Sequence, residues 1–139
     1  MNSAHWEHFE HKADIGIRGF GQTLAEAFEQ AALAMSAVVT DTASIQVTTT
    51  INISCRDDND DALLYDWLNA LIYEMATRKM LFSRFDVTIS HGKLNAMVAG
   101  EAIDIQRHQP AVEIKGATYT ELAVYQHEDH WVAQCVVDV

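Results

Sequence analysis

A dense run of oxygen-bearing side chains, Asp-Asp-Asn-Asp-Asp at positions 57–61, has the composition of a calcium-binding loop. Its first, third and fifth residues stand where such a loop places ligands. The sixth position, however, is Ala62, where the sharp turn requires glycine, and the twelfth is Leu68, where a bidentate glutamate is needed. We therefore expect these acids to cap and solvate the start of the helix that follows them.

Histidines form a second candidate group, because His5, His8 and His11 recur at every third residue. On a strand His8 faces away from the other two, and on a helix the three side chains spread around the surface. Zinc-type sites need ligands that converge on one point. The spacing therefore argues against a histidine metal site, and His127 and His130 are expected to be solvated in a polar turn.

The sequence contains no motif for a catalytic nucleophile or for nucleotide binding. The sequence contains no GxSxG, P-loop, GxGxxG, HExxH or HxE–CxxC arrangement. Cys55 and Cys135 lie in strand-like apolar runs, where a reduced and buried thiol is the ordinary state. A cysteine nucleophile with a histidine partner stays open as an alternative, although a buried thiol is inert. The sequence therefore offers no catalytic constellation of its own.

Two isolated acids, Asp14 and Asp138, form the third candidate group. Asp14 interrupts an apolar context between Ala13 and Ile15, and Asp138 ends a strongly β-forming run directly before Val139. Their carboxylates and the α-carboxylate of Val139 are hard oxygen ligands, which suit Ca²⁺ or Mg²⁺ better than zinc. From the pattern alone, the more ordinary interpretation is that isolated aspartates cap or solvate chain ends.

The elements that must position these residues are predicted from hydrophobic periodicity. Residues 6–12 and 15–20 indicate two strands or one bent strand. Helices are predicted from the capping box of Thr23 and Glu26 to about Val38, and over 63–75. Strands are predicted over 45–55, 85–89, 94–98 and 113–115, with a loop before Pro110 and a C-terminal hairpin of 122–125 and 131–137. The fold class is therefore α+β, mostly antiparallel sheet with two main helices covering one or both faces.

Length and charge narrow the classes of protein and partner. A chain of 139 residues with one proline and six glycines indicates a single domain over 1–139. Nine basic and 20 acidic residues give a net charge of −11, which repels nucleic acid and favours a basic protein surface or a cation as partner. No apolar stretch approaches the roughly 18 residues of a membrane span. The N-terminus lacks a signal-peptide layout, so we expect a cytoplasmic protein without a membrane partner.

Five blocks spread along the whole chain form an ordered series. Residues 9–17 are FEHKADIGI, 24–28 are LAEAF, 67–73 are WLNALIY, 113–119 are EIKGATY and 131–139 are WVAQCVVDV. In this order they resemble the opening signature, the two helices, the V-K-A-x-T-Y-H block and the closing W-x-A-x-V-V-x-D-I/V of the archease family. The agreement of five blocks is far more specific than any one of them.

The resemblance implies an archease-like fold and a non-enzymatic accessory protein of RNA processing. Archeases activate the RtcB-type RNA ligase of tRNA splicing and RNA repair, promoting guanylylation of the ligase and multiple turnover. Family members bind a divalent cation, with Ca²⁺ seen and Mg²⁺ an alternative, through positions that correspond to Asp14, Asp138 and Val139. Lys115 and His11 carry over as candidates for contact with the partner. A chain end extended by a tag, or shortened by one residue, is then expected to impair function.

Two departures and two rival functions qualify the resemblance. Thr120 stands where the family commonly has histidine, which leaves the role of that position open, and Gly116 replaces a common alanine. One rival is a chaperone-like modulator of tRNA-modifying enzymes, which has also been suggested for the family. The other is a small metal-dependent hydrolase with a carboxylate as general base, which needs a perturbed acid or base that the sequence does not locate.

Overall fold

The first long helix, α1 (Leu24–Val39), begins where the sequence predicts, in a computed structural model that describes residues 4–139. The hydroxyl of Thr23 accepts a hydrogen bond from the N–H of Glu26 at 3.1 Å, and the Glu26 carboxylate accepts one from the N–H of Thr23 at 3.2 Å. These reciprocal bonds satisfy backbone donors that a helix start leaves unpaired. The apolar face, including Phe28 and Met35, is buried.

The second long helix, α2 (Asp60–Arg78), extends beyond the predicted 63–75 at both ends. The side chain of Asn59 caps it by accepting a backbone N–H, and acids occupy its first turn, where negative charge is favoured. It ends at Lys79, which adopts a left-handed conformation with φ 54°. The indole N–H of Trp67 donates to the carbonyl of Phe28 at 3.1 Å, so a buried hydrogen bond joins α2 to α1.

One antiparallel sheet of five strands combines both ends of the sequence. Its strands are β1 (His5–His11), β2 (Asp14–Gly21), β6 (Gly116–Ala117), β7 (Ala123–His127) and β8 (His130–Asp138). The order is β1-β2-β8-β6, and β7 also pairs with β8. Strand β8 therefore holds the sheet together, and the predicted N-terminal strands and C-terminal hairpin are confirmed.

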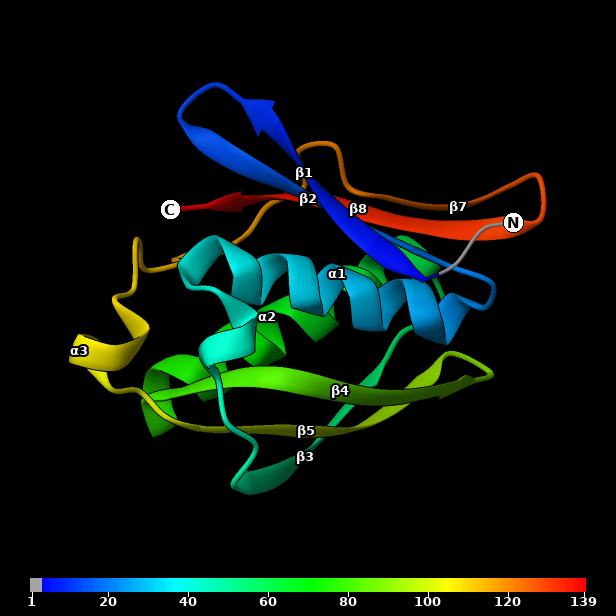
Figure 1. Ribbon diagram of the computed structural model, residues 1–139. Helices are drawn as coiled ribbons and strands as arrows, with labels where there is room; N and C mark the ends of the chain where they lie inside the picture. Colours follow the sequence, from blue (N-terminus) through cyan, green and yellow to red (C-terminus); the bar gives the residue numbers. More distant parts are fainter. Residues whose placement is uncertain (1–3) are drawn as a thin grey trace.

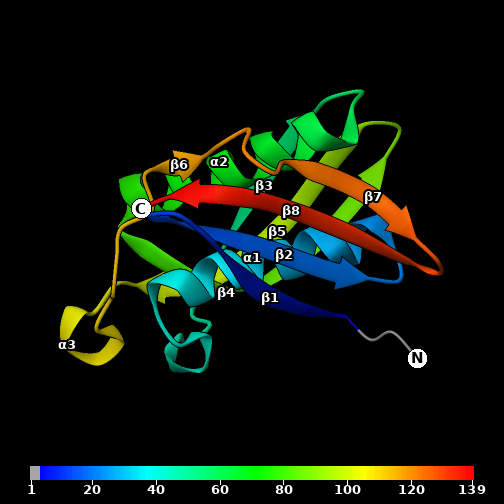
Figure 2. The same ribbon diagram turned by 90° about the horizontal axis from the view of Figure 1, so that it is seen from above.

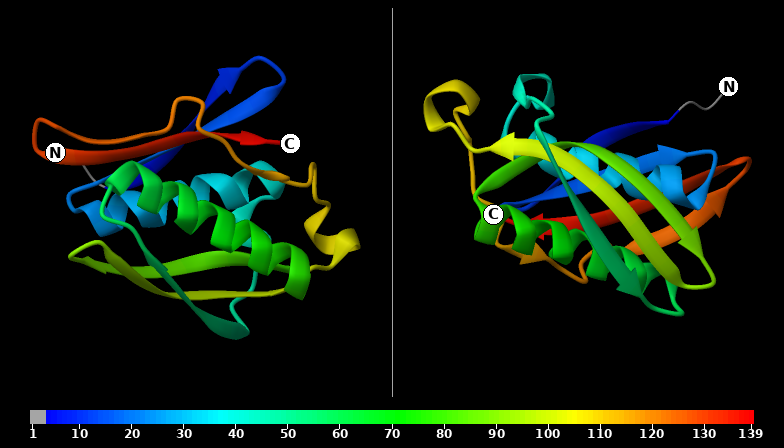
Figure 3. Two further views of the ribbon diagram at one scale, coloured as in Figure 1. Left: turned by 180° about the vertical axis from the view of Figure 1, so that it is seen from behind. Right: turned by 90° about the horizontal axis from the view of Figure 1, so that it is seen from below.

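The other sheet has three antiparallel strands, β3 (Thr49–Arg56), β4 (Met80–Ser90) and β5 (Lys93–Ala102), with β5 in the middle. Figures 1 and 3 show α1 and α2 lying between the two sheets, so each sheet is covered by helices on its inner face. The inward-facing residues of both sheets and the apolar faces of both helices form one buried core. The α+β class with two main helices is thus confirmed.

Three local predictions are wrong. The strand predicted over 45–55 begins only at Thr49, because residues 45–48 have no regular secondary structure and follow a short 3₁₀ helix, η1 (Thr42–Ser44), capped by the Asp41 side chain. The strand predicted over 113–115 is displaced, since pairing with β8 begins at β6. The predicted loop before Pro110 contains a short helix, α3 (Ile105–His108). Over residues 4–139, no helix is long and apolar enough to cross a membrane.

Candidate metal site

The register of sheet pairing brings Asp14 and Asp138 together. Strand β2 pairs with β8 so that Ile15 lies opposite Val137. Continuing this antiparallel register by one residue places Asp14, the first residue of β2, opposite Asp138, the last residue of β8. Figure 2 shows the start of β2 beside the C-terminal end of the chain. Two acids from opposite ends of the sequence thus occupy neighbouring positions on one sheet.

Both acids face the outer side of the sheet. Val137 and Ile17 belong to the core between the sheets, and residues one position along a strand point to the opposite face. Asp14 is therefore half-buried and Asp138 exposed on the face that the helices do not cover. Directly opposed like charges destabilise an antiparallel pair, so this arrangement favours a cation between the two carboxylates.

The donor set fits a hard divalent cation. Two carboxylates and the α-carboxylate of Val139, which follows Asp138 directly, supply only oxygen, the ligand type that Ca²⁺ and Mg²⁺ prefer. Within residues 4–139, no three or more His, Cys, Asp or Glu side chains are grouped as a metal site. A third protein ligand of the candidate site would therefore have to be a main-chain oxygen.

The two predicted partner-contact residues lie beside these acids. His11 is opposite Asp14 in the β1–β2 hairpin and is half-buried. The backbone N–H of Lys115 donates to the carbonyl of Asp138 at 2.8 Å, while its side chain is exposed. Five predicted site residues, His11, Asp14, Lys115, Asp138 and Val139, thus lie at one end of the five-stranded sheet.

The polar residues at 57–61 cap the N-terminus of α2, as predicted. The Asp57 carboxylate accepts the N–H of Asn59 at 3.1 Å, and the Asn59 side chain caps α2. Asp61 also accepts the N–H of Val124 in β7 at 2.7 Å, which ties the start of α2 to the five-stranded sheet. The segment therefore has a structural use in the fold.

The remaining histidines do not converge on one point. His8 lies on the opposite face of β1 from His5 and His11, and its Nε2 donates to the carbonyl of Ala34 in α1 at 2.8 Å. The prediction that His130 is simply solvated is wrong. Its side chain is only 13% exposed and lies against the ring of Phe20, at 6.0 Å between centroids.

Neither cysteine is an activated nucleophile. Cys135 is buried and Cys55 half-buried, the latter less covered than predicted, and both are free thiols. Burial raises the pKa of each thiol to about 11, so the reactive thiolate is disfavoured at neutral pH. The Cys135 thiol donates to the carbonyl of Thr118 at 3.1 Å. Both cysteines therefore act as packing residues.

A stacked pair of tyrosines, one of them in the block at 113–119, was not predicted. Tyr119 is 75% exposed and stacks on Tyr65 of α2, with ring centroids 4.5 Å apart. The neighbouring Thr120 contributes its backbone, whose carbonyl accepts the N–H of Val136 at 3.1 Å. The Thr-Tyr dipeptide in the block was the only sequence feature that indicated this position. The sequence alone could not show that the tyrosine ring packs on α2.

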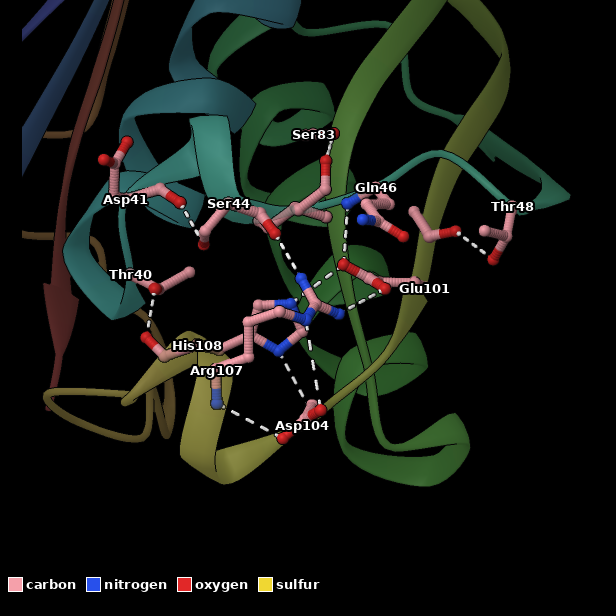
Figure 4. Close-up of polar contacts among 12 residues, drawn as sticks. Thr40, Asp41, Ser44, Gln46, Thr48, Ser83, Glu101, Asp104, Arg107 and His108 are labelled. Carbon is pink, nitrogen blue, oxygen red and sulfur yellow. Dashed lines mark hydrogen bonds and ion pairs between the residues drawn. The ribbon is translucent and has the colours of Figure 1, made fainter.

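A buried polar network around Glu101 was also missed. Figure 4 shows its carboxylate receiving hydrogen bonds from Arg107 at 2.6 Å, His108 Nε2 at 2.9 Å and the N–H of Gln46 at 2.6 Å. The other ring nitrogen of His108 accepts the N–H of Asp104 at 2.9 Å, so Nε2 carries the hydrogen. The network fixes α3 and η1 against β5, and its donors and acceptors are paired with one another.

The network makes acid stability depend on Glu101. The Arg107 hydrogen bond, with those from Gln46 and His108, lowers the pKa of Glu101 to about 2. This pKa lies below the unfolded value of about 4.3. The contribution of Glu101 to the free energy of unfolding is therefore complete above about pH 4.3 and disappears as the pH falls to about 2. We expect Glu101→Gln to lower the urea midpoint at neutral pH, with the deficit relative to wild type shrinking across this acid range. Exposed Glu121→Gln is the control, and a pH-independent deficit would contradict the linkage.

Three comparisons place the chain among known proteins. The model of the archease protein family matches residues 6–139. The archease of Pyrococcus furiosus is 39% identical over 139 residues, covering 96% of this chain and 98% of that protein. The archease of Sulfolobus acidocaldarius is 34% identical over 136 residues, with the same coverage of each chain.

Solved structures agree on the fold. The solution structure of a Methanobacterium thermoautotrophicum protein superposes with a TM-score of 0.80 at 27% identity, covering 96% of this chain and 98% of that one. A crystal structure from Thermotoga maritima, described as an archease and possible chaperone, gives a TM-score of 0.59 at 18% identity, with 96% of each chain covered. This second likeness bears on the fold alone.

Proposed function

Because the chain belongs to the archease family, we propose that it is an accessory protein that activates an RtcB-type RNA ligase in tRNA splicing or RNA repair. Its part is to promote guanylylation of the ligase and so sustain multiple turnover, without chemistry of its own. The unactivated thiols and the absence of nucleotide-binding motifs in the sequence support a non-catalytic role.

The observation that carries the proposal is the β2–β8 register, which places Asp14 and Asp138 at neighbouring positions on an uncovered sheet face. In this proposal the two carboxylates and the α-carboxylate of Val139 hold a divalent cation, most simply Ca²⁺, with Mg²⁺ as the alternative. When bound, the cation supplies positive charge and open coordination positions. The chain's own residues orient this face toward the ligase, with His11 and Lys115 beside the acids as candidate contacts.

Surface charge supports a basic protein partner. Twenty acidic against nine basic residues give the chain a net charge of −11, and an RNA ligase must offer a positive cleft to its substrate. Opposite charges accelerate the encounter of two proteins and fix their orientation. The same charge disfavours direct binding of RNA, so the proposal places RNA contact with the ligase.

The test is RNA ligation under multiple turnover, with the cognate ligase and sub-stoichiometric amounts of this chain. Wild-type protein should raise product yield beyond one turnover per ligase, and Asp14→Ala should remove at least about 90% of that stimulation, since loss of one of three charged ligands costs more than tenfold in affinity. Asp86→Ala, which removes an exposed aspartate from the three-stranded sheet, is the matched control. Full stimulation by Asp14→Ala would overturn the site assignment.

The same assay separates activation from a chaperone-like role. A chaperone that only keeps its client soluble should protect the ligase from aggregation regardless of Asp14. Light scattering of heated ligase, with wild-type protein or Asp14→Ala, therefore complements the ligation assay. Equal protection by both proteins, together with equal ligation, would favour the chaperone-like role.

A further inference from the structure

Strand β1 forms an open edge of the five-stranded sheet. In the part of the chain that the structure describes, β1 pairs with β2 alone, in unbroken register from His5 to His11. Five of its seven residues are exposed, and Figure 2 shows the strand along one margin of the molecule. Strand β1 contains no proline, lysine or bulge, three of the features that protect natural edge strands, and its two glutamates are the only charged residues along the edge.

The hairpin turn determines which backbone groups this edge presents. Two residues separate His11 from Asp14, so these two flank a two-residue hairpin turn and form a hydrogen-bonded pair. Hydrogen-bonded pairs alternate along an antiparallel ladder, so Phe9 and Glu7 also direct their backbone groups toward β2. Trp6, His8 and Glu10 therefore direct their N–H and C=O groups outward.

The sequence of this edge is complementary to itself in one register. We propose that β1 is a self-association strand, which pairs antiparallel with β1 of a second copy about a two-fold axis at Phe9. This register places His8 opposite the partner's Glu10 and Glu7 opposite the partner's His11. The hydrogen-bonding groups also match, because His8 and Glu10 are the residues whose backbone faces outward.

Neighbouring registers lack this complementarity. A two-fold axis at His8 pairs His8 with itself and Glu7 with the partner's Phe9. An axis at Glu7 places two glutamates directly opposite each other, which destabilises a strand pair. The axis at Phe9 instead places the two Phe9 rings opposite each other and pairs a histidine with a glutamate at each neighbouring position. The side-chain pattern therefore selects this one register.

The surrounding structure leaves room for the second strand. Helix α1 approaches β1 from the inner face, where the carbonyl of Ala34 accepts from His8 Nε2. On the outer face, the Arg18 guanidinium lies over the Phe9 ring, 4.5 Å from its centroid, and binds Glu7 at 2.6 Å. Both contacts lie on the faces of the sheet and neither occupies its edge.

Net charge makes this association weak and dependent on salt. Each copy carries −11, so long-range repulsion opposes pairing, while contacts across the strand edge act at short range. Salt at about 0.15 M screens charges beyond about 8 Å and leaves the edge contacts largely intact. The dimer should therefore be measured at physiological or higher salt.

Analytical ultracentrifugation of the full chain over a concentration series tests the proposal. Wild-type protein should show a reversible monomer–dimer equilibrium that strengthens with salt. Glu10→Pro removes an outward N–H from each copy without breaking pairing with β2, and should weaken association at least about tenfold. Glu10→Gln, which keeps the N–H and a hydrogen-bonding side chain, should associate more strongly than the proline variant.

Glu10→Lys provides a second variant should the proline variant fold poorly. It places an ammonium group opposite the partner's His8 twice in each dimer and should also favour the monomer. Circular dichroism confirms the fold of each variant before association is compared. A wild-type protein that stays monomeric at all concentrations, or Glu10→Pro and Glu10→Lys variants that dimerise like wild type, would overturn the proposal.

Discussion

Replacing Asp138 with asparagine is expected to abolish stabilisation of the fold by calcium and to make the metal-free protein slightly more stable. The two effects have opposite signs because the carboxylate serves two interactions. With a cation, it is a ligand; without one, it faces the like charge of Asp14 across the strand pair. If Asp138 had a structural role unrelated to metal, Asp138→Asn would change the stability in the same direction with and without calcium.

The expected magnitudes follow from linkage. At a free cation concentration about 100 times the dissociation constant, binding adds about 2.7 kcal/mol to the free energy of unfolding of the wild type, and Asp138→Asn should lose nearly all of it. In excess chelator, removing one of two opposed charges should add about 0.2–1 kcal/mol. Urea unfolding under both conditions measures the two differences directly.

Asp86→Asn is the matched control for this experiment, because it removes an exposed carboxylate from the other sheet. It should leave the calcium-dependent stabilisation unchanged. Equal stabilisation of wild type and Asp138→Asn by calcium would contradict the proposed ligand set, whatever the ligase assay shows. If calcium stabilises neither, the same series with Mg²⁺ decides between the two cations.

The second large effect is expected in the packing of α1 on the sheet. A Cβ atom at Gly19 in β2 would lie 2.3 Å from the backbone nitrogen of Ala31 and 2.4 Å from the carbonyl oxygen of Ala27. These atoms belong to the backbone of α1, so the helix as a whole must move away from the sheet. We expect Gly19→Ala to cost at least about 3 kcal/mol in the free energy of unfolding, the upper range for overpacking.

Gly116→Ala supplies the control, with the same added methyl group. A Cβ at Gly116 would lie 3.7 Å from the side-chain oxygen of Asn69, an ordinary contact distance. This variant should unfold within about 0.5 kcal/mol of wild type, as a change without a clash does. Similar midpoints for Gly19→Ala and wild type in urea unfolding would contradict the close approach of α1 to β2.

Local signals in the sequence predicted the long helices well. The capping box at Thr23 and Glu26 and the periodic apolar residues act within one or two turns, so α1 begins where predicted. Strand boundaries were less accurate where tertiary contacts decide them. Ile45 continues the alternating pattern of β3, but it follows η1 and is buried by packing outside any strand.

The candidate site could be predicted only in part. The chemistry of Asp14 and Asp138 is visible in the sequence, but their pairing depends on a register between distant strands, and the family resemblance alone indicated it. The Glu101 network gave no signal, because it joins Glu101 of β5 to α3 and to Gln46, which follows η1, and α3 itself was predicted as a loop.

The central position of β8 has a consequence for synthesis of the protein. Strand β2 emerges from the ribosome long before its partner β8, which follows all the other described strands in sequence, and β6 and β7 also wait for β8. Pairing of such distant strands is slow, and the nascent chain exposes unpaired edges until it forms. The paired acids can therefore form only after β8 has been synthesised, so this surface distinguishes molecules with a complete five-stranded sheet from nascent ones.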